Sequence, residues 1–463
     1  MICRTLLLIL ALILPTVTPA QRKRDFRGVW LQTVYQEQYS RQTTQQNRQY
    51  LRNLLDQLSQ AGVNVVFFQV RSKADAFYKS DIEPWSRQLT GLEGKAPSPA
   101  WDPLEFMVAE CHARGMELHA WINPYRGPRT SDIIAAGSPV KKHPGWFVKN
   151  NGVYYFNPAK QACRDYICSI VADIVRRYDI DGIHFDDYFY PYPSKEKFPD
   201  AADYKASNSK LSLGNWRRRN VDLLIQQVHG TISAIKPWIR FGISPFGIWR
   251  NHKTDATGSE TAGLQGYDDL YADVPLWAKK GWIDYQIPQL YWELDHARAS
   301  YRTLCAWWAT QSHGRHIYIG QDIKKTVEAD ELQEKIELAN RAETIEGNCW
   351  WYATIFHTLP STLYSAKALV PEYLWLPTEA ASQPKGLAYV NLTLSWHTDA
   401  NARKWVVYRF DSAKHIDIEQ PSAIVAVTYS NSIQITKSGY YVVTALDHTN
   451  AESSPSSPIH IKL

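Results

Sequence analysis

The sequence has little cysteine and no cysteine pattern. Only six Cys occur in 463 residues, and none of them forms a CxxC pair. One lies at position 3, and the other five are widely spaced: Cys111, Cys163, Cys168, Cys305 and Cys349. A small disulfide scaffold needs a dense, even set of cysteines, and a structural zinc site needs them in close pairs. The sequence therefore predicts neither.

The chain also lacks any strong excess of charge. Its 51 basic and 46 acidic residues give a formal charge of +5, and there is no long run of Lys or Arg. Such a balance gives no indication of nucleic acid as a partner. A content of 44% hydrophobic and 21% charged residues is typical of a folded protein with a large core, and excludes a disordered chain.

Several motifs of catalysis are missing. The sequence contains no GxSxG, P-loop or HExxH pattern, which argues against a serine hydrolase, a nucleotide-phosphate site and a zinc peptidase. Two adjacent aspartates could bind a divalent cation, but no third carboxylate or His clusters with them. We therefore expect no metal site and no cofactor.

Long hydrophobic runs are absent except at the start. Residues 1–20 contain an early Arg4, an unbroken apolar stretch from Leu6 to Leu14, and small residues ending at Ala20. This pattern predicts a secretory signal peptide that is cleaved near Ala20. An uncleaved anchor is the alternative, but the stretch is shorter than a membrane span needs. We expect an exported protein, periplasmic, attached to the outer envelope or secreted, with no transmembrane span once the signal is removed.

Aromatic residues are abundant: 18 Trp, 27 Tyr and 14 Phe make up 13% of the chain. Many of them fall in eight short apolar runs that alternate with amphipathic helical stretches, as strands of a buried parallel sheet do. Eight such units predict a (β/α)8 barrel over residues 24–372. An open doubly wound sheet is the main alternative, but no GxGxxG turn follows the first run. The runs begin at Phe26, Val63, Met116, Ile180, Ile239, Asp284, His316 and Cys349.

The composition changes after Pro371. Residues 373–385 are rich in proline and small polar residues and are predicted to be a linker. Residues 386–463 form short alternating segments separated by turn residues, which predicts a β-sandwich. With Trp396 and Tyr408 in successive strands and YYVVTALD near the end, this segment resembles a fibronectin type III domain. The resemblance implies that Tyr440 or Tyr441 is the tyrosine-corner residue, and it suggests a contact with another protein.

The strongest candidate site is the run DGIHFDDYFYP, residues 181–191. In a barrel of this type, polar residues at the C-terminal ends of the strands carry the chemistry. Asp186 and Asp187 end the fourth strand, and strand alternation predicts that only one of them faces the barrel mouth. We take Asp186 as nucleophile or base and hold Asp187 in reserve, for example to orient an N-acetyl group. The structural alternative is that one Asp caps a loop and the other pairs with Arg71.

A second carboxylate follows the sixth strand. Glu293 comes after Tyr291 and Trp292, and a carboxyl group beside Trp292 would be desolvated and neutral, as a general acid must be. The alternatives are an exposed loop Glu and a role for Asp295 instead. Two carboxylates across a barrel mouth, surrounded by aromatic faces that can stack on sugars, indicate glycoside hydrolysis.

Other polar and aromatic residues near strand ends are candidates for substrate binding. His184 could donate to the substrate or to Asp186, but a buried, hydrogen-bonded histidine is the alternative. Each tryptophan near a strand end, such as Trp30, Trp121 and Trp351, could stack on a sugar or pack in the core. The full set of predicted binding residues is Arg71, Asn123, Tyr125, Arg126, His184, Tyr188, Trp249, Tyr291 and Trp292.

Seven pieces occur in order along the barrel: RGVWLQTV, FFQVRSKADAFY, LHAWINPYR, FNP, DGIHFDDYFYP, SPFGIWR and PQLYWE. With them the chain resembles the glycosyl-hydrolase-like family 10 barrels over about residues 26–356. The resemblance implies a glycosidase fold in an exported bacterial envelope protein that acts on cell-wall glycan. The DGxxxD spacing of Asp181, Gly182 and Asp186 also resembles the α-amylase and chitinase clans, although Tyr188 stands where chitinases have their acid Glu.

Together these observations predict a glycoside hydrolase whose polysaccharide substrate is the glycan strand of peptidoglycan. One alternative is a hydrolase of dietary or host polysaccharide that uses the same residues. The other is a non-catalytic glycan-binding protein of the envelope.

Overall fold

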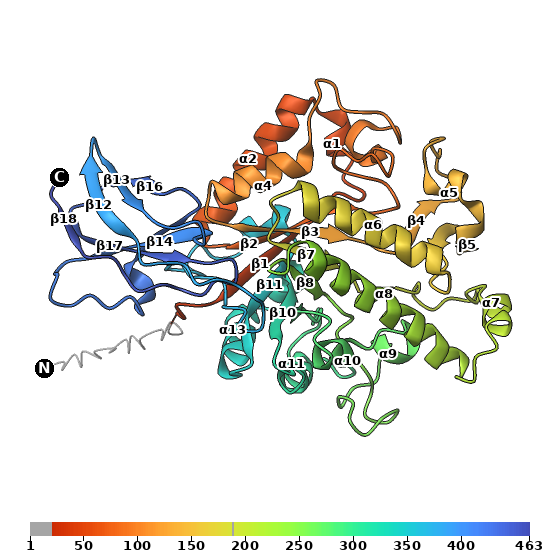
Figure 1. Cartoon of the computed structure of the whole chain (residues 1–463). Helices are drawn as coiled ribbons and strands as arrows, with labels where there is room; N and C mark the ends of the chain where they lie inside the picture. The colour runs from red at the N-terminus through yellow and green to blue at the C-terminus, as the bar shows by residue number, and fades with distance from the viewer. Residues whose placement is uncertain (1–20, 188) are drawn as a thin grey trace, which may run out of the picture.

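The computed structural model describes residues 21–187 and 189–463. Eight parallel strands close into a barrel, and a smaller all-β region packs beside it (Figure 1). Closure is visible at Val29, which pairs with Val66 on one side and with Trp350 on the other. The predicted signal peptide, residues 1–20, lies outside the described residues. The barrel strands are β1 (Phe26–Leu31), β2 (Val65–Arg71), β3 (Glu117–Ile122), β7 (Gly182–Phe185), β8 (Arg240–Ile243), β9 (Tyr285–Gln286), β10 (His316–Asp322) and β11 (Ile345–Trp351).

The order around the barrel follows the chain, so each crossover places its helices on the outside. Leu51, Leu54, Leu55 and Leu58 form the buried stripe of α2, as their spacing predicts, and the Thr43 side chain caps its first turn. The longer helices are α2 (Thr44–Gln60), α4 (Pro103–His112), α6 (Gln161–Arg177), α8 (Leu213–Ile235), α11 (Tyr301–Ala309) and α13 (Leu332–Arg341). The shorter ones are α1 (Gln38–Arg41), α3 (Arg87–Thr90), α5 (Pro139–Lys142), α7 (Ala201–Ala206), α9 (Gly266–Asp269), α10 (Val274–Lys279) and α12 (Ile323–Glu328).

All eight predicted strands are present, but the last one is displaced. The predicted run began at Cys349 and reached Phe356, whereas β11 begins at Ile345 and is followed by the 3-10 helix Ala353–Thr358. Polar residues precede Cys349, so the apolar pattern in the sequence does not show where the strand begins. Asn348 is buried there because its Oδ1 accepts a hydrogen bond from Gln321 at 2.6 Å.

An insertion after β3 adds a small antiparallel sheet, β4 (Arg126–Arg129), β5 (Phe147–Asn150) and β6 (Val153–Phe156), in the order β4-β6-β5. This sheet was not predicted from the sequence. Its first strand begins directly beyond the C-terminal end of β3, so the insertion extends one wall of the barrel mouth.

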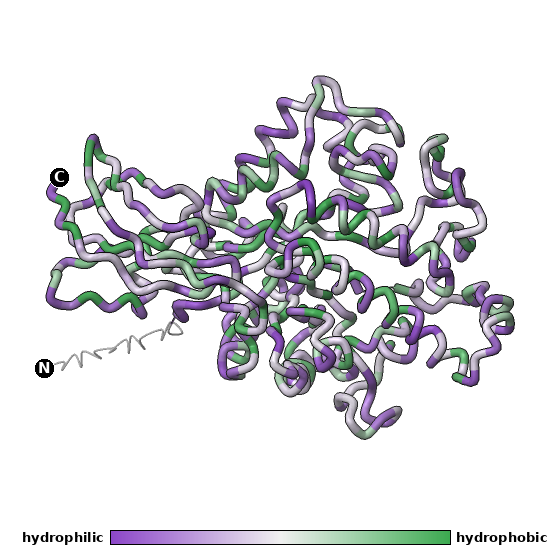
Figure 2. Tube along the Cα trace, in the orientation of Figure 1, coloured by the Kyte–Doolittle hydropathy of each residue, from purple (hydrophilic) through white to green (hydrophobic). Residues whose placement is uncertain are grey.

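The C-terminal region forms two antiparallel sheets, as predicted, with hydrophobic stretches along their strands (Figure 2). Trp396 and Tyr441 are buried between them. The Tyr441 hydroxyl donates to the carbonyl of Lys437 at 2.6 Å, which is the contact of a tyrosine corner. The strands are β12 (Lys385–Val390), β13 (Thr393–His397) and β16 (Ser432–Gln434) in one sheet, and β14 (Lys404–Phe410), β15 (Ile424–Thr428), β17 (Gly439–Leu446) and β18 (Ile459–Ile461) in the other.

The sandwich packs against the N-terminal ends of the barrel strands, opposite the barrel mouth. Lys404 of β14 donates to Glu117 at 2.6 Å, and both side chains are almost fully buried. Asp181 lies at this end, as predicted, and accepts from Arg403 at 3.2 Å. The predicted linker is anchored as well, since Trp375 donates to Asp284 at 2.7 Å.

Within residues 21–187 and 189–463, no helix has the length and apolarity needed to cross a membrane. The five cysteines of this part of the chain are all buried and free.

Candidate active site

A cavity of about 400 Å3 opens at the C-terminal ends of the barrel strands. Its lining comes from the ends of β1, β2, β3 and β11, from the start of β4, and from the loops after β1, β7, β8 and β9. This is the position at which barrels of this type carry their chemistry. The lining residues are Trp30, Gln32, Val34, Tyr35, Gln69, Trp121, Arg126, Asp186, Asp187, Tyr192, Ser244, Gln289, Tyr291 and Trp351.

Both Asp186 and Asp187 line this cavity. The prediction that only one of them faces the barrel mouth is wrong, because β7 ends at Phe185 and strand alternation no longer applies beyond it. The backbone N–H of Asp187 donates to Oδ1 of Asp186 at 2.8 Å. Among the described lining residues these two are the only carboxylates.

A chain of amides fixes Asp186. Oε1 of Gln69 accepts from the backbone N–H groups of Thr33 and Val34, so its Nε2 is left to donate, and it does so to Oδ1 of Asn123 at 2.8 Å. Nδ2 of Asn123 then donates to Oδ2 of Asp186 at 2.9 Å. With the N–H of Asp187, donors therefore reach both oxygens of Asp186 and hold the carboxyl group in place.

Asp187 has the opposite environment. Its side chain is 6% exposed, and Tyr192 donates a hydrogen bond to Oδ2. Burial, and then the negative charge of Asp186, raise the pKa of Asp187 well above its usual range, although the Tyr192 hydroxyl acts in the other direction. The two adjacent groups thus differ in environment: the pKa of Asp187 is raised, whereas Asp186 accepts two hydrogen bonds, and such a difference can separate acid and base roles in an enzyme site.

Three tryptophans form an aromatic wall of the cavity. Trp351 lies edge-on to both Trp30 and Trp121, with ring centroids 6.4 and 6.1 Å apart. From the sequence, each of them could either stack on a sugar or pack in the core, and in the structure all three line the cavity. Their apolar faces suit the C–H surface of a sugar ring.

Of the predicted binding residues, Arg126 and Tyr291 line the cavity and Asn123 lies directly beneath it. Burial raises the pKa of Tyr291, so its hydroxyl stays protonated and can donate. Tyr188 lies outside the described residues.

Arg71 and Tyr125 do not reach the cavity, contrary to prediction. Arg71 is fully buried in a bidentate ion pair with Glu83, at 2.7 and 2.8 Å, and its Nη1 donates to the carbonyl of Asn123. It therefore supports the backbone at Asn123 instead of binding substrate. Tyr125 is 1% exposed and belongs to the core, because the chain turns away after β3.

His184 is also a structural residue. Trp30 Nε1 can only donate, so its 3.1 Å contact makes His184 Nε2 an acceptor and leaves the proton on Nδ1, which faces the Tyr285 hydroxyl at 3.3 Å. Burial holds the pKa of His184 well below its usual range. Tyr285 crosses the barrel interior over Gly242, where a Cβ atom would lie 2.0 Å from its ring. The prediction that His184 contacts substrate is therefore wrong.

The expected desolvation of Glu293 is not found. The Glu293 side chain is exposed and does not line the cavity. Trp292 packs edge-on against Phe246, with centroids 5.6 Å apart, and does not line the cavity. Trp249 donates to Asp273 at 3.2 Å and stacks on Trp307, again outside the cavity lining. In the loop after β9, Tyr291 lines the cavity, but Trp292 and Glu293, which follow it, do not.

Several lining residues were absent from the predicted set. Gln69 and Ser244 occur at predicted strand ends, and that position was a usable signal. Tyr35 and Tyr192 lie four and seven residues beyond β1 and β7, so only the path of the loops brings them to the cavity.

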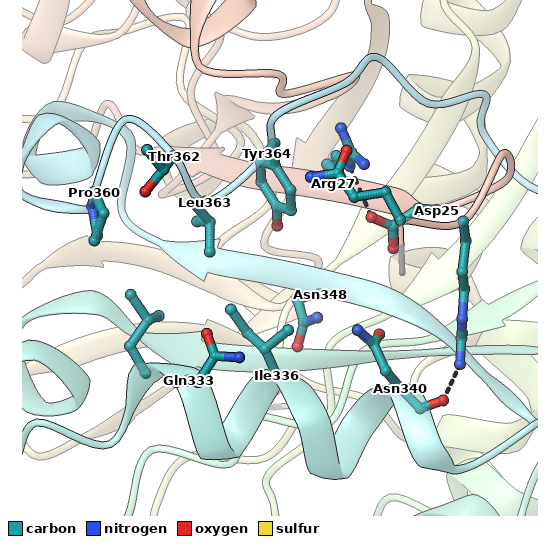
Figure 3. Close-up of a pocket in the computed structure, with 13 residues that line it drawn as sticks. Asp25, Arg27, Gln333, Ile336, Asn340, Asn348, Pro360, Thr362, Leu363 and Tyr364 are labelled. Atoms are coloured by element: carbon teal, nitrogen blue, oxygen red, sulfur yellow. Dashed lines mark hydrogen bonds and ion pairs between the residues drawn. The ribbon is translucent and has the colours of Figure 1, made fainter. Parts of the chain in front are cut away.

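A second hollow, of about 140 Å3, lies beside the N-terminal end of β1 (Figure 3). Asn340 and Ile336 of α13 face Tyr364 and Arg27 across it, and Arg27 pairs with Asp25 at 2.7 Å. It is remote from the carboxylate pair. Within the described residues, no group of three or more His, Cys, Asp or Glu side chains is placed to hold a metal ion.

The family described as glycosyl hydrolase-like 10 matches residues 25–337, which is more than half of the chain. The chain belongs to this family. Its curated relatives include "Glycosyl hydrolase YngK" of Bacillus subtilis, 38% identical over 80% of this chain and 78% of the relative. "Glycosyl hydrolase DigH" of Escherichia coli K12 is 36% identical over 69% of this chain and 78% of the relative.

This member of the glycosyl hydrolase-like 10 family is thus a glycoside hydrolase. Among solved structures, the glycoside hydrolase domain of PgaB (BpsB) from Bordetella bronchiseptica is 14% identical, with a TM-score of 0.48 over 71% of this chain and 94% of that domain. An endo-β-1,4-mannanase from Thermotoga petrophila is 9% identical, with a TM-score of 0.44 over 94% of this chain and 98% of the mannanase.

Proposed function

We propose that this hydrolase cleaves the glycan strands of peptidoglycan next to a 2-acetamido sugar, with Asp187 as general acid and Asp186 as the carboxylate that orients the acetamido group. The observation that carries the proposal is the adjacent pair itself: one carboxyl group has a raised pKa and the other is held by two donors.

Asp187 has the property that protonation of a leaving group requires. A carboxyl group that keeps its proton near neutral pH can donate it to the glycosidic oxygen as the bond to C1 breaks. Tyr192 donates to Oδ2 of Asp187, and Asp187 lines the cavity in which the glycosidic oxygen would lie.

The nucleophile is proposed to come from the substrate. In a two-carboxylate retaining site the groups stand on opposite sides of the scissile bond, but here both follow the same strand end and no third carboxylate lines the described cavity. The carbonyl oxygen of a 2-acetamido group can attack C1 of its own sugar. Asp186 would accept the acetamido N–H and stabilise the positive charge that develops on that group.

The proposed reaction has two steps, formation of an oxazolinium ring and its hydrolysis. The acetamido oxygen forms a bond to C1, the bond from C1 to the leaving oxygen breaks, and Asp187 gives its proton to that oxygen. Water next attacks C1 of the oxazolinium ring, with ionised Asp187 taking its proton. The ring opens, the acetamido group is restored, and Asp187 is again protonated.

A polymer fits the shape of the site. Tyr35 lines both the central cavity and a neighbouring hollow of about 360 Å3, and Tyr192 lines both the cavity and a hollow of about 380 Å3. The central cavity is therefore flanked by a hollow on each of two sides, which could receive further sugars of a polymer. Both sugars of a peptidoglycan strand carry the 2-acetamido group, and this glycan lies outside the cytoplasm, in keeping with the export proposed from the signal-like N-terminus.

The test compares hydrolysis of purified peptidoglycan glycan strands by the native protein and by Asp186→Asn, Asp187→Asn and Glu293→Gln. We expect kcat to fall by about a hundredfold or more in both aspartate variants. Glu293→Gln is the matched control, because Glu293 is exposed and outside the cavity, and it should retain full activity. Full activity in both aspartate variants would contradict the proposal.

A further inference from the structure

Beside the central cavity, cationic side chains surround Tyr35. Lys73 Nζ lies 4.8 Å from the centre of its ring, and the guanidinium carbons of Arg126 and Arg129 lie 5.5 and 5.4 Å from it. The Tyr35 hydroxyl accepts hydrogen bonds from Arg126 at 2.6 Å and from Arg129 at 3.4 Å. Arg126 comes from the start of β4 and Arg129 from its end, so the inserted sheet delivers both guanidinium groups to this point.

The hollow on this side of Tyr35 holds more positive than negative charge. Lys73, Arg87 and Arg129 line it together with two carboxylates, Glu37 and Asp132. Glu37 forms an ion pair with Arg41, and Asp132 lies 2.8 Å from Arg87 and 3.8 Å from Lys73. Arg126 adds a further cation where the hollow meets the central cavity.

The pKa of Tyr35 reflects the positive charges around it. Burial alone would raise the pKa of Tyr35, but the positive charges of Arg126, Lys73 and Arg129 outweigh it and lower the pKa below its ordinary value. The environment therefore stabilises negative charge, although Tyr35 itself is half exposed. A positive field beside an open cleft concentrates anionic ligands at that place.

We propose that this basic arm, formed by Tyr35, Lys73, Arg126 and Arg129, is a subsite for the carboxylate of an acidic sugar next to the cleaved bond. The inference rests on the proposed function, since it concerns the strand bound in the same cleft. Guanidinium groups bind carboxylates through two parallel hydrogen bonds, which also fixes the orientation of the sugar that carries the group. Every second sugar of a peptidoglycan strand bears a lactyl carboxyl group, so the arm sets the register of the strand across Asp187.

Arg129 is the residue for the test, because it is exposed and lies outside the central cavity. The substrates are glycan strands with free lactyl carboxylates and the same strands after reduction of those groups to alcohols. The native protein is expected to prefer the free form in kcat/KM by about tenfold, in line with one charge-assisted pair. Arg129→Gln should lose most of this preference through a rise in KM for the free form.

Arg176→Gln is the matched control, since Arg176 is exposed in the last turn of α6, at the opposite end of the barrel, and the charge change is the same. It should keep the preference of the native protein. Loss of the preference in both variants would point to net charge alone and would overturn the subsite, as would an unchanged preference in Arg129→Gln.

Binding separates the subsite from the proposed function. Calorimetry of Asp187→Asn with both strands should give a dissociation constant about tenfold lower for the free form, and Arg129→Gln in that background should remove the difference. Equal cleavage and equal binding of the two strands by native protein would overturn the subsite alone. No cleavage and no binding of either strand would overturn the proposed function as well.

Discussion

The side-chain amide of Gln69 donates to Oδ1 of Asn123 at 2.8 Å, and this contact decides which atom Asn123 presents to Asp186. Because Gln69 Oε1 is already occupied by the N–H groups of Thr33 and Val34, the direction of each bond along this row is fixed. Together, Gln69 and Asn123 therefore hold the Asp186 carboxyl group in position.

Gln69→Glu tests this row of amides. An ionised Glu at position 69 would keep the two bonds from the backbone but could not donate, so Asn123 would turn its oxygen toward Asp186. Asp186 would then lose the hydrogen bond from Asn123 and its fixed position, so kcat/KM should fall about tenfold. Gln45→Glu, on the exposed side of α2, is the control. An unchanged kcat/KM in Gln69→Glu would contradict the role of Gln69.

Asp187→Asn should behave as a variant that lacks its general acid. Hydrolysis of natural glycan, whose leaving group is a sugar alcohol, is expected to fall by about a hundredfold to ten-thousandfold. Substrates with a nitrophenol leaving group need little protonation, so their first step should fall far less. Steady-state kinetics on the two substrate types measure the difference, and an equal loss on both would show that Asp187 does not protonate the leaving group.

Tyr192→Phe should shift the alkaline limb of the pH profile. The Tyr192 hydroxyl stabilises ionised Asp187, so its removal raises the pKa of Asp187 further. The active form requires protonated Asp187; activity is therefore lost as the pH rises through this pKa, and the limb should move to higher pH. The pH dependence of kcat/KM for the native protein and the variant checks the sign. A shift to lower pH would be inconsistent with Asp187 as the acid.

Lys404→Met tests how the sandwich is attached to the barrel. Glu117 is buried among Lys404, Asn450 and Arg240, and removal of Lys404 leaves much of its charge without a partner. The free energy of unfolding should fall by about 3 kcal/mol, as measured by denaturant titration. Lys414→Met, in an exposed loop, should change it little. Two separate unfolding transitions in the native protein would argue that the regions are not coupled in this way.

The sequence predicts the barrel well because strands buried on both faces carry apolar side chains at most positions, and every residue of β1, β2 and β3 is buried. The sequence pattern misplaces β11, which has polar residues before Cys349; one of them, Asn348, has its hydrogen-bond partner Gln321 on the neighbouring β10. The same reason explains Arg71: its buried partner, Glu83, lies in a loop whose path no local pattern reveals.

The candidate site was predicted in part. Asp186 and Asp187 stand out because two charges at the end of a buried strand are costly without a purpose. Their separate roles depend on Asn123 and Tyr192, which come from different loops and meet only in the folded chain. Glu293 was chosen for an aromatic neighbour in the sequence, but adjacent residues need not share an environment once a strand has ended.

The anomeric configuration of the first product tests the proposed chemistry most directly. Proton NMR during cleavage of peptidoglycan glycan strands by the native protein records the new reducing end before it mutarotates. Attack by the acetamido oxygen followed by attack of water inverts C1 twice, so the account predicts a product with the configuration of the bond that was cleaved. A product of inverted configuration would require water to attack directly, and would contradict the roles assigned to Asp186 and Asp187.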